Sequence, residues 1–213
     1  MSTTENISIY GYSDGELNPS HEYLVPELHR LLQRIDFSRE GKRIFELGCG
    51  NGSVAQTLNL AGFDVTGVDP SAQGITQAKA HYPHLNLNPG SAYDDLRAQY
   101  GQFPAVVSLE VVEHVFDPRL YAATLYDLIL PGGHGIVSTP YHGYWKNLAL
   151  ALTGKMDAHF TALWDGGHIK FWSVATLSRL LAEAGFEIVS VTRVGRIPIL
   201  AKSMVALIRK PAA

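Results

Sequence analysis

The chain has little of several features that mark particular classes of protein. Its 213 residues include one cysteine, Cys49, which excludes an intrachain disulfide and fits a reducing compartment such as the cytoplasm. No apolar run reaches the roughly 20 residues of a membrane-spanning helix, and the polar N-terminal stretch is not typical of a signal peptide. The net charge is −3, without a block of like charges. DNA and RNA are therefore not favoured as partners, and at most a peripheral membrane contact is expected.

Short apolar runs alternate with amphipathic stretches along the rest of the chain. Strands are predicted at 43–47, 63–68, 85–88, 104–109, 134–139, 185–193 and 203–209. Helices are predicted at 20–35, 52–61, 71–81, 92–99, 117–130 and 173–184. This alternation indicates an α/β fold, a doubly wound and mostly parallel sheet of seven strands with helices on both faces. Because no helix separates the last two strands, we expect them to be joined antiparallel or by a loop that crosses the end of the sheet.

We predict a single domain over residues 1–213 with four parts: an N-terminal helix at 19–35, a ligand-binding core at 40–140, an insertion at 141–172, and C-terminal strands at 185–210. The start of the first helix is indicated by Asn18 as a cap and Pro19 at the first helical position. The insertion is rich in aromatic residues, and insertions of this length often form lids. Tyr10 and Tyr12 are further candidates to close over a ligand.

Two strand ends carry residues suited to a nucleotide-like ligand. Residues 46–52, Glu-Leu-Gly-Cys-Gly-Asn-Gly, follow one strand and open a helix, so the backbone is accessible and unpaired N–H groups point into the turn. Residues 67–71, Gly-Val-Asp-Pro-Ser, end the next strand with Asp69, an acid suited to ribose hydroxyls. A dinucleotide site would have a third glycine where Ser53 stands, which argues against a nicotinamide cofactor.

These two motifs resemble those of the class I S-adenosylmethionine-dependent methyltransferases, and the resemblance covers roughly residues 40–210. It implies a Rossmann-like methyltransferase fold with an antiparallel last strand, and S-adenosyl-L-methionine as the cofactor. It also implies a set of cofactor-binding residues, namely Glu46, Gly48, Gly50, Asp69, Pro70, Ser91, Ala92, Leu109 and Glu110. Many relatives carry aspartate where Ser91 stands, so the adenine contact would here depend on a hydroxyl.

The stretch Glu110-Val-Val-Glu113-His114 leaves the fourth strand where an acceptor would meet the methyl donor. On a helical turn, Glu110, Glu113 and His114 would share one face and could bind a divalent cation, with His168 as a further ligand and His142 as its competitor. The pattern resembles the ubiquinone-biosynthesis O-methyltransferases and the small-RNA 2′-O-methyltransferases, and the latter hold magnesium with such a motif and a downstream histidine. Alternatively, His114 packs beside the cofactor, the acids cap the turn, and no metal binds.

We therefore expect methyl transfer from S-adenosylmethionine to a small-molecule acceptor, aromatic or apolar, most directly O-methylation of a hydroxyl. His168 and His114 are the catalytic candidates, and either His168 as a base or a divalent metal (Mg, Zn, Mn or Fe) at Glu110, Glu113 and His114 would assist deprotonation. N- or C-methylation of a small molecule and RNA 2′-O-methylation remain open. So do an NAD-dependent oxidoreductase and a non-catalytic cofactor-binding subunit.

Overall fold

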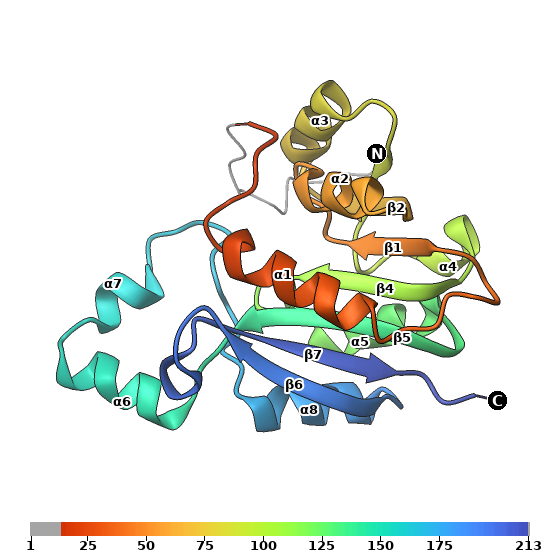
Figure 1. The fold of residues 1–213 in the computed structure, drawn as a ribbon. Helices are drawn as coiled ribbons and strands as arrows, with labels where there is room; N and C mark the ends of the chain where they lie inside the picture. Colours follow the sequence, from red (N-terminus) through yellow and green to blue (C-terminus); the bar gives the residue numbers. More distant parts are fainter. Residues whose placement is uncertain (1–13, 213) are drawn as a thin grey trace.

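The computed structural model describes residues 14–212, which form one seven-stranded sheet with helices on both faces (Figure 1). Tyr10 and Tyr12 lie outside the described residues. The sheet order is β3-β2-β1-β4-β5-β7-β6. The strands are β1 (Arg43–Leu47), β2 (Asp64–Asp69), β3 (Asn86–Pro89), β4 (Phe103–Leu109), β5 (Ile129–Pro140), β6 (Glu187–Val194) and β7 (Ser203–Arg209).

The direction of the strands confirms the predicted fold class. β3, β2, β1, β4 and β5 are parallel neighbours, so their carboxyl ends meet at one edge of the sheet. β7 lies between β5 and β6 and is antiparallel to both. The reason is local: only a short 3-10 turn, η1 (Pro198–Leu200), separates β6 from β7, and so short a connection returns the chain antiparallel.

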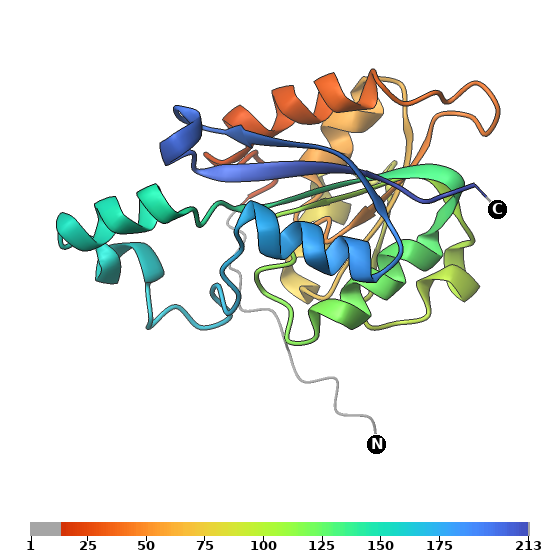
Figure 2. The ribbon, with the colours of Figure 1, turned by 90° about the horizontal axis from the view of Figure 1, so that it is seen from below.

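The helices divide into two layers (Figures 1 and 2). One face carries α1 (His21–Leu32), α2 (Ser53–Leu60) and α3 (Ala72–His81), and the other carries α4 (Leu96–Tyr100), α5 (Pro118–Leu128) and α8 (Val174–Glu183). Leu28 of α1 packs in one core with Ile44 of β1, whereas Tyr121 of α5 and Leu181 of α8 are fully buried in the other. Because both faces are covered, the central strands have few polar side chains and their functional groups gather at the strand ends.

Several predicted boundaries shift. α1 begins at His21, although Asn18 still accepts hydrogen bonds from the backbone N–H groups of Ser20 and His21. The strand predicted to begin at 134 instead begins at Ile129, and Ile129 pairs with Phe103 before the register shifts. Residues 131–133, which the prediction left between a helix and a strand, therefore lie within β5, although pairing with β4 is interrupted there and resumes at His134 with Ala105. α4 is shorter than predicted, with five residues.

The insertion between β5 and α8 is partly helical. It contains α6 (Tyr144–Leu152) and α7 (Met156–Phe160), which extend beyond the carboxyl end of β5 (Figures 1 and 2). Its two ends are joined by a parallel bridge between Tyr141 and Trp172 and by the His142 N–H, which donates to the Trp172 carbonyl at 2.8 Å. None of the α6 residues is buried. Across residues 14–212, no helix is long and apolar enough to cross a membrane.

Candidate functional site

The glycine turn at the end of β1 is held against the end of β2. Gly48 and Gly50 have positive φ angles of 89° and 51°, which side chains rarely tolerate. The Gly50 N–H donates to Asp69 Oδ2 at 2.9 Å, and the Ser71 N–H donates to Asp69 Oδ1 at 2.8 Å. Each carboxylate oxygen keeps acceptor capacity for a second donor. The predicted pair of strand-end motifs is thus one structural unit built around Asp69.

Two buried side chains line the interior of this unit. Burial and, to a lesser degree, the negative charge of Asp69 raise the pKa of Glu46 well above its usual value. Glu46 Oε2 is buried and has no hydrogen-bond partner among residues 14–212. Burial, followed by the charges of Glu46 and Asp69, raises the pKa of the Cys49 thiol well above its usual value. Cys49 is therefore held as a thiol and is a poor nucleophile.

The remaining predicted cofactor residues lie at neighbouring strand ends. The Gly90 N–H donates to the Asp69 carbonyl at 3.1 Å, which joins the turn carrying Ser91 and Ala92 to the end of β2. Ser91 is half-buried and its Oγ accepts from the Tyr93 N–H. Pro70 is exposed, Ala92 is buried, and Leu109 is buried at the end of β4. These residues form a continuous row along the carboxyl edge of the sheet.

Glu110 was predicted to share one helical face with Glu113 and His114, but the structure does not place it there. Its backbone is left-handed, with φ of 55°, so residues 110–114 do not share one helical face. Its carboxylate accepts hydrogen bonds from the Ser138 hydroxyl at 2.8 Å and the Ser203 hydroxyl at 3.2 Å, on β5 and β7. Burial raises the pKa of Glu110 to about 7, although both hydroxyls and the charge of Lys146 act in the opposite direction. Nothing in the sequence spacing signals the partners Ser138 and Ser203.

The raised pKa of Glu110 predicts a measurable effect on stability. Between pH 4.5 and 7 this group is protonated in the folded chain and ionised in the unfolded chain, so unfolding releases a proton and stability falls as the pH rises. The Glu110→Gln variant should lose this dependence, and its stability relative to wild type should rise by up to about 3 kcal/mol over that range. Urea unfolding at several pH values measures the difference, with the exposed Glu183→Gln as control. Parallel curves for Glu110→Gln and wild type would contradict the assignment.

Three other side chains at the end of β4 do converge. Ligand atoms of Glu113, His114 and His168 all lie within 4.8 Å of one another. The imidazoles of His114 and His168 meet edge to face with ring centroids 4.9 Å apart, and the Trp164 ring lies 5.4 Å from His168. Glu110 is not part of this group, because its carboxylate is bonded to Ser138 and Ser203. Of the four predicted metal ligands, the structure thus brings three together.

The backbone fixes the orientation of this cluster. His114 Nδ1 lies 2.9 Å from the Gly166 carbonyl, so Nδ1 donates and Nε2 carries the free lone pair. The N–H groups of Ile169 and Lys170 donate to the Glu113 carbonyl at 2.9 and 3.0 Å. The indole N–H of Trp172 donates to the Val112 carbonyl at 3.2 Å. Residues 166–172 of the insertion are therefore fastened to the turn at 112–114, although the two segments are distant in sequence.

The pKa values of Glu113 and His168 are shifted toward their neutral forms, which suits metal ligands better than a general base. Burial raises the pKa of Glu113 well above its usual value, and the charge of Glu110 adds to this. Neither buried Glu113 carboxylate oxygen makes a hydrogen bond of ordinary geometry in the described part of the chain, although the Thr139 hydroxyl acts to lower this pKa. Burial, with the neighbouring imidazoles and Lys146, lowers the pKa of His168 to about 4. The lowered pKa keeps His168 neutral and makes it a weak base.

A hollow of about 500 Å³ adjoins the cluster inside the insertion, and His168 is shared between the two. Its lining consists of His142, Asn147, Phe160, Ala162, His168 and Phe171. His142, the predicted competitor of His168, is buried, and burial with the charges of Lys146 and His159 lowers its pKa to about 4. His142 thus lines the hollow without joining the group of potential ligands, whereas His168 does both.

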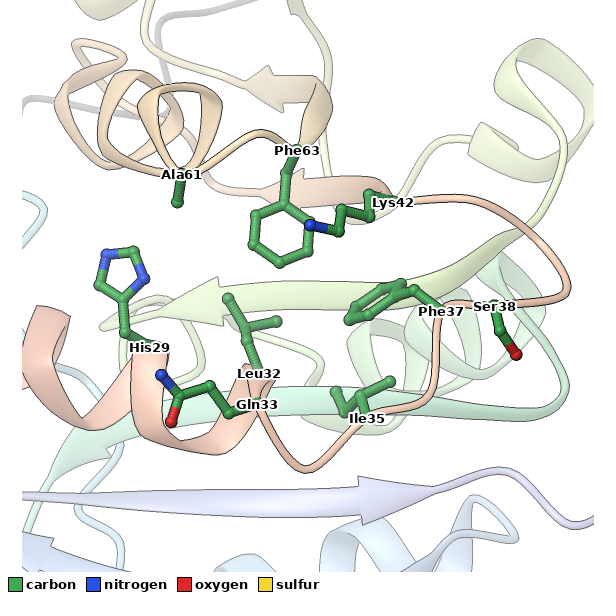
Figure 3. Close-up of a pocket in the computed structure, with 9 residues that line it drawn as sticks. All are labelled: His29, Leu32, Gln33, Ile35, Phe37, Ser38, Lys42, Ala61 and Phe63. Carbon is green, nitrogen blue, oxygen red and sulfur yellow. The ribbon is translucent and has the colours of Figure 1, made fainter.

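A second hollow, of about 460 Å³, lies between α1, residues 35–38 and the segments that precede β1 and β2 (Figure 3). Lys42 directly precedes β1 and Phe63 directly precedes β2, so this hollow is at the amino ends of the strands. Ligands of open α/β sheets bind at the carboxyl ends. It is therefore on the wrong side of the sheet to join the site.

Asn51 is a residue of the turn whose role the sequence did not reveal. Its side-chain amide donates to the Asp14 carbonyl at 2.9 Å and to the Glu16 carbonyl at 3.0 Å. The Tyr82 hydroxyl donates to the Gly15 carbonyl between them at 2.7 Å. Residues 14–16 are thus fastened against the glycine turn, and no local pattern in the sequence links them to it.

The Asn51→Ala variant should release residues 14–16 from the turn. Loss of the two hydrogen bonds to this segment, each worth about 1 kcal/mol, should weaken ligand binding in the turn by up to about 30-fold. Calorimetric titration with S-adenosylhomocysteine measures this, with Asn59→Ala as the control because Asn59 bonds to the Phe63 carbonyl at the far end of α2. Equal affinity in Asn51→Ala and Asn59→Ala would show that residues 14–16 do not support the site.

Comparison with known proteins agrees with this geometry. Residues 20–191 match the family described as "Methyltransferase domain". The chain is 30% identical over 190 residues to the ubiquinone biosynthesis O-methyltransferase of Cereibacter sphaeroides, covering 81% of this chain and 75% of that protein. It is 37% identical over 129 residues to the protein of that name from Caulobacter sp., covering 59% of this chain but only half of that protein.

Among solved structures, an S-adenosylmethionine-dependent methyltransferase from Mesorhizobium loti shares the fold. Its TM-score is 0.66 at 20% identity, over 86% of this chain and 97% of that one. The family match covers most of the chain, and the predicted cofactor motifs meet at the carboxyl edge of the sheet as one unit around Asp69. The chain therefore belongs to the S-adenosylmethionine-dependent methyltransferases.

Proposed function

We propose that this methyltransferase transfers the methyl group to a hydroxyl of a small, flat acceptor bound between the end of β4 and the insertion. The observation that carries the proposal is the convergence of Glu113, His114 and His168, with ligand atoms within 4.8 Å of one another. This cluster lies directly after β4, whose neighbour β1 ends in the glycine turn. An acceptor held at the cluster would thus be close to the residues assigned to the methyl donor.

The residues of the turn fit the cofactor. Asp69 has spare acceptor capacity on both carboxylate oxygens for the two ribose hydroxyls, as its position at the end of β2 suggests. Glu46 Oε2 is a buried acceptor without a partner among the described residues. When bound, S-adenosylmethionine supplies a methyl group on a positively charged sulfonium, which needs no further activation. The main task of the chain is therefore to position the acceptor and manage its proton.

The proposed role of Glu113, His114 and His168 is to hold a divalent cation. Their chemistry suits this: His114 presents Nε2, the imidazoles are neutral because their pKa values are lowered, and Glu113 has two unpartnered oxygens in this part of the chain. A divalent cation there would supply Lewis acidity toward the acceptor hydroxyl. A general-base role for His168 remains the alternative, although a group with a pKa of about 4 accepts a proton weakly.

The insertion at 141–172 is proposed to cover the acceptor. Phe160 and Phe171 give the hollow an apolar, aromatic wall, which suits a flat acceptor. Exposed apolar side chains on its outer surface, including Tyr144, Trp145, Leu152 and Leu163, would allow a peripheral contact with a membrane or another apolar surface. The single buried cysteine fits the reducing environment of the cytoplasm.

A methyl-transfer screen tests this proposal. The purified chain is incubated with S-adenosylmethionine and with catechols, simple phenols, hydroxy-lipids, amines or short RNA, with and without Mg²⁺, and S-adenosylhomocysteine formation is measured. Transfer to catechols or phenols supports the proposal. Transfer only to amines would indicate N-methylation, and transfer only to RNA would indicate the 2′-O alternative. Cofactor binding without transfer to any class would favour a non-catalytic cofactor-binding subunit.

A further inference from the structure

Residues 110–114, which follow β4, contact both halves of the candidate site. Val111 packs directly against Gly48 in the glycine turn, since a Cβ added at Gly48 would collide with a methyl group of Val111. The ends of β4 and β1 are also joined by the buried Ser108 hydroxyl, which donates to the Leu47 carbonyl at 2.8 Å. Residues 110–114 are therefore in close contact with the segment proposed to bind the cofactor.

The same residues contact the insertion through their backbone. The indole N–H of Trp172 donates to the Val112 carbonyl at 3.2 Å. Two backbone N–H groups of the insertion donate to the Glu113 carbonyl at 2.9 and 3.0 Å. Because Val112 and Glu113 directly follow Val111, a displacement of Val111 shifts both carbonyl groups. The insertion segment that these bonds fasten includes His168, one of the three potential ligands.

The contacts of residues 110–114 hold a backbone that would not form by itself. Glu110 has a φ of 55°, a left-handed conformation that residues other than glycine rarely adopt. Its carboxylate accepts from the Ser138 and Ser203 hydroxyls at 2.8 and 3.2 Å. Such a conformation persists only while the surrounding structure holds it. Loss of the contact between Val111 and Gly48 would therefore let these residues relax to another arrangement.

We infer that Val111 is a positioning residue that couples cofactor binding to the acceptor side of the site. The inference rests on the proposed function and adds cooperative binding to it. A cofactor bound on the glycine turn restrains Gly48, which in turn restrains Val111, and the two following carbonyl groups restrain the segment that carries His168. A cation then binds to ligands that are already ordered, which raises its affinity. By linkage, the cation raises the cofactor affinity by the same factor.

Electron paramagnetic resonance of free Mn²⁺, with and without saturating S-adenosylhomocysteine, tests this coupling. In the wild-type chain, S-adenosylhomocysteine should lower the dissociation constant of Mn²⁺ about tenfold, a common size for coupling between two sites. In Val111→Ala the factor should fall to about twofold, because the shorter side chain leaves a gap beside Gly48. Val111→Thr keeps the branched shape and should keep most of the factor. Val189→Ala, at an exposed position of the edge strand β6, is the matched control and should keep all of it.

A merely structural role of Val111 gives a different result. It would weaken binding of Mn²⁺ and of S-adenosylhomocysteine separately and would leave the factor between the two states of the chain unchanged. An unchanged factor in Val111→Ala would therefore overturn the inference. Equal Mn²⁺ affinity with and without S-adenosylhomocysteine in the wild-type chain would also overturn it, while the proposed cation site would stand.

Hydrogen exchange separates the inference from the proposed cation. The Ile169 and Lys170 amides donate to the Glu113 carbonyl, so S-adenosylhomocysteine alone should slow their exchange in the wild-type chain and much less in Val111→Ala. If the chain binds no Mn²⁺ but shows this protection, the inference stands and the proposed cation fails. If it binds no Mn²⁺ and the protection is absent, both are overturned.

Discussion

Replacement of Asp69 by alanine is expected to raise the dissociation constant of S-adenosylmethionine at least 100-fold. The carboxylate accepts the N–H groups of Gly50 and Ser71, and it is the proposed acceptor for the ribose hydroxyls. Alanine would leave two buried donors unpaired and would also remove the ligand contact, at a combined cost of about 3 kcal/mol or more. Calorimetric titration measures the change. The dissociation constant of Asp69→Asn, which retains one carbonyl oxygen, should lie between those of wild type and Asp69→Ala.

Asp64→Ala provides the matched control for this prediction. Asp64 is the first residue of the same strand, is exposed, and lies at the amino edge of the sheet. The replacement should leave the dissociation constant within about twofold of wild type, because an exposed position away from special features affects little. Unchanged affinity in Asp69→Ala, or tighter binding of NADH than of S-adenosylmethionine, would refute the assignment of the cofactor site.

The second large effect is expected at the cluster after β4. Glu113→Gln should weaken binding of Mn²⁺ by 10- to 100-fold and should abolish most methyl transfer, with little change in S-adenosylmethionine affinity. Glutamine keeps the shape of the side chain but offers only one neutral carbonyl oxygen as a ligand. His168→Ala should weaken Mn²⁺ binding similarly. Electron paramagnetic resonance of free Mn²⁺ gives the affinity independently of activity.

Glu110→Gln is the decisive control for this experiment. Glu110 is three residues from Glu113, but its carboxylate accepts from Ser138 and Ser203 instead of facing the imidazoles. Its replacement should change Mn²⁺ affinity by less than about threefold. Equal losses of Mn²⁺ affinity in Glu110→Gln and Glu113→Gln would show that Glu110 binds the cation together with the other three predicted ligands. Full activity after exhaustive chelation, with an inactive His168→Ala, would make His168 a plain base.

Local sequence determined the fold class and the two strand ends proposed to bind the cofactor. The alternation of strands and helices and the missing helix before the last strand predicted the sheet, because each pattern acts over a few neighbouring residues. Gly48, Gly50 and Asp69 were found for the same reason: a turn that needs positive φ and a strand that ends in an acid are both local features. One boundary shift arose from pairing between strands, at Ile129, which pairs with Phe103.

Tertiary structure decided the arrangement of the residues that are proposed to bind the acceptor. His168 lies 54 residues after His114 (168 − 114), and only the fastening of residues 166–172 to the turn at 112–114 brings the two imidazoles together. Glu110 has the spacing of a metal ligand, yet its left-handed backbone aims it at hydroxyls from β5 and β7. Asn51 carries no motif, because it holds residues 14–16, which meet it only in the folded chain. Sequence thus determined the strand ends proposed to bind the methyl donor, and long-range packing determined the groups proposed to surround the acceptor.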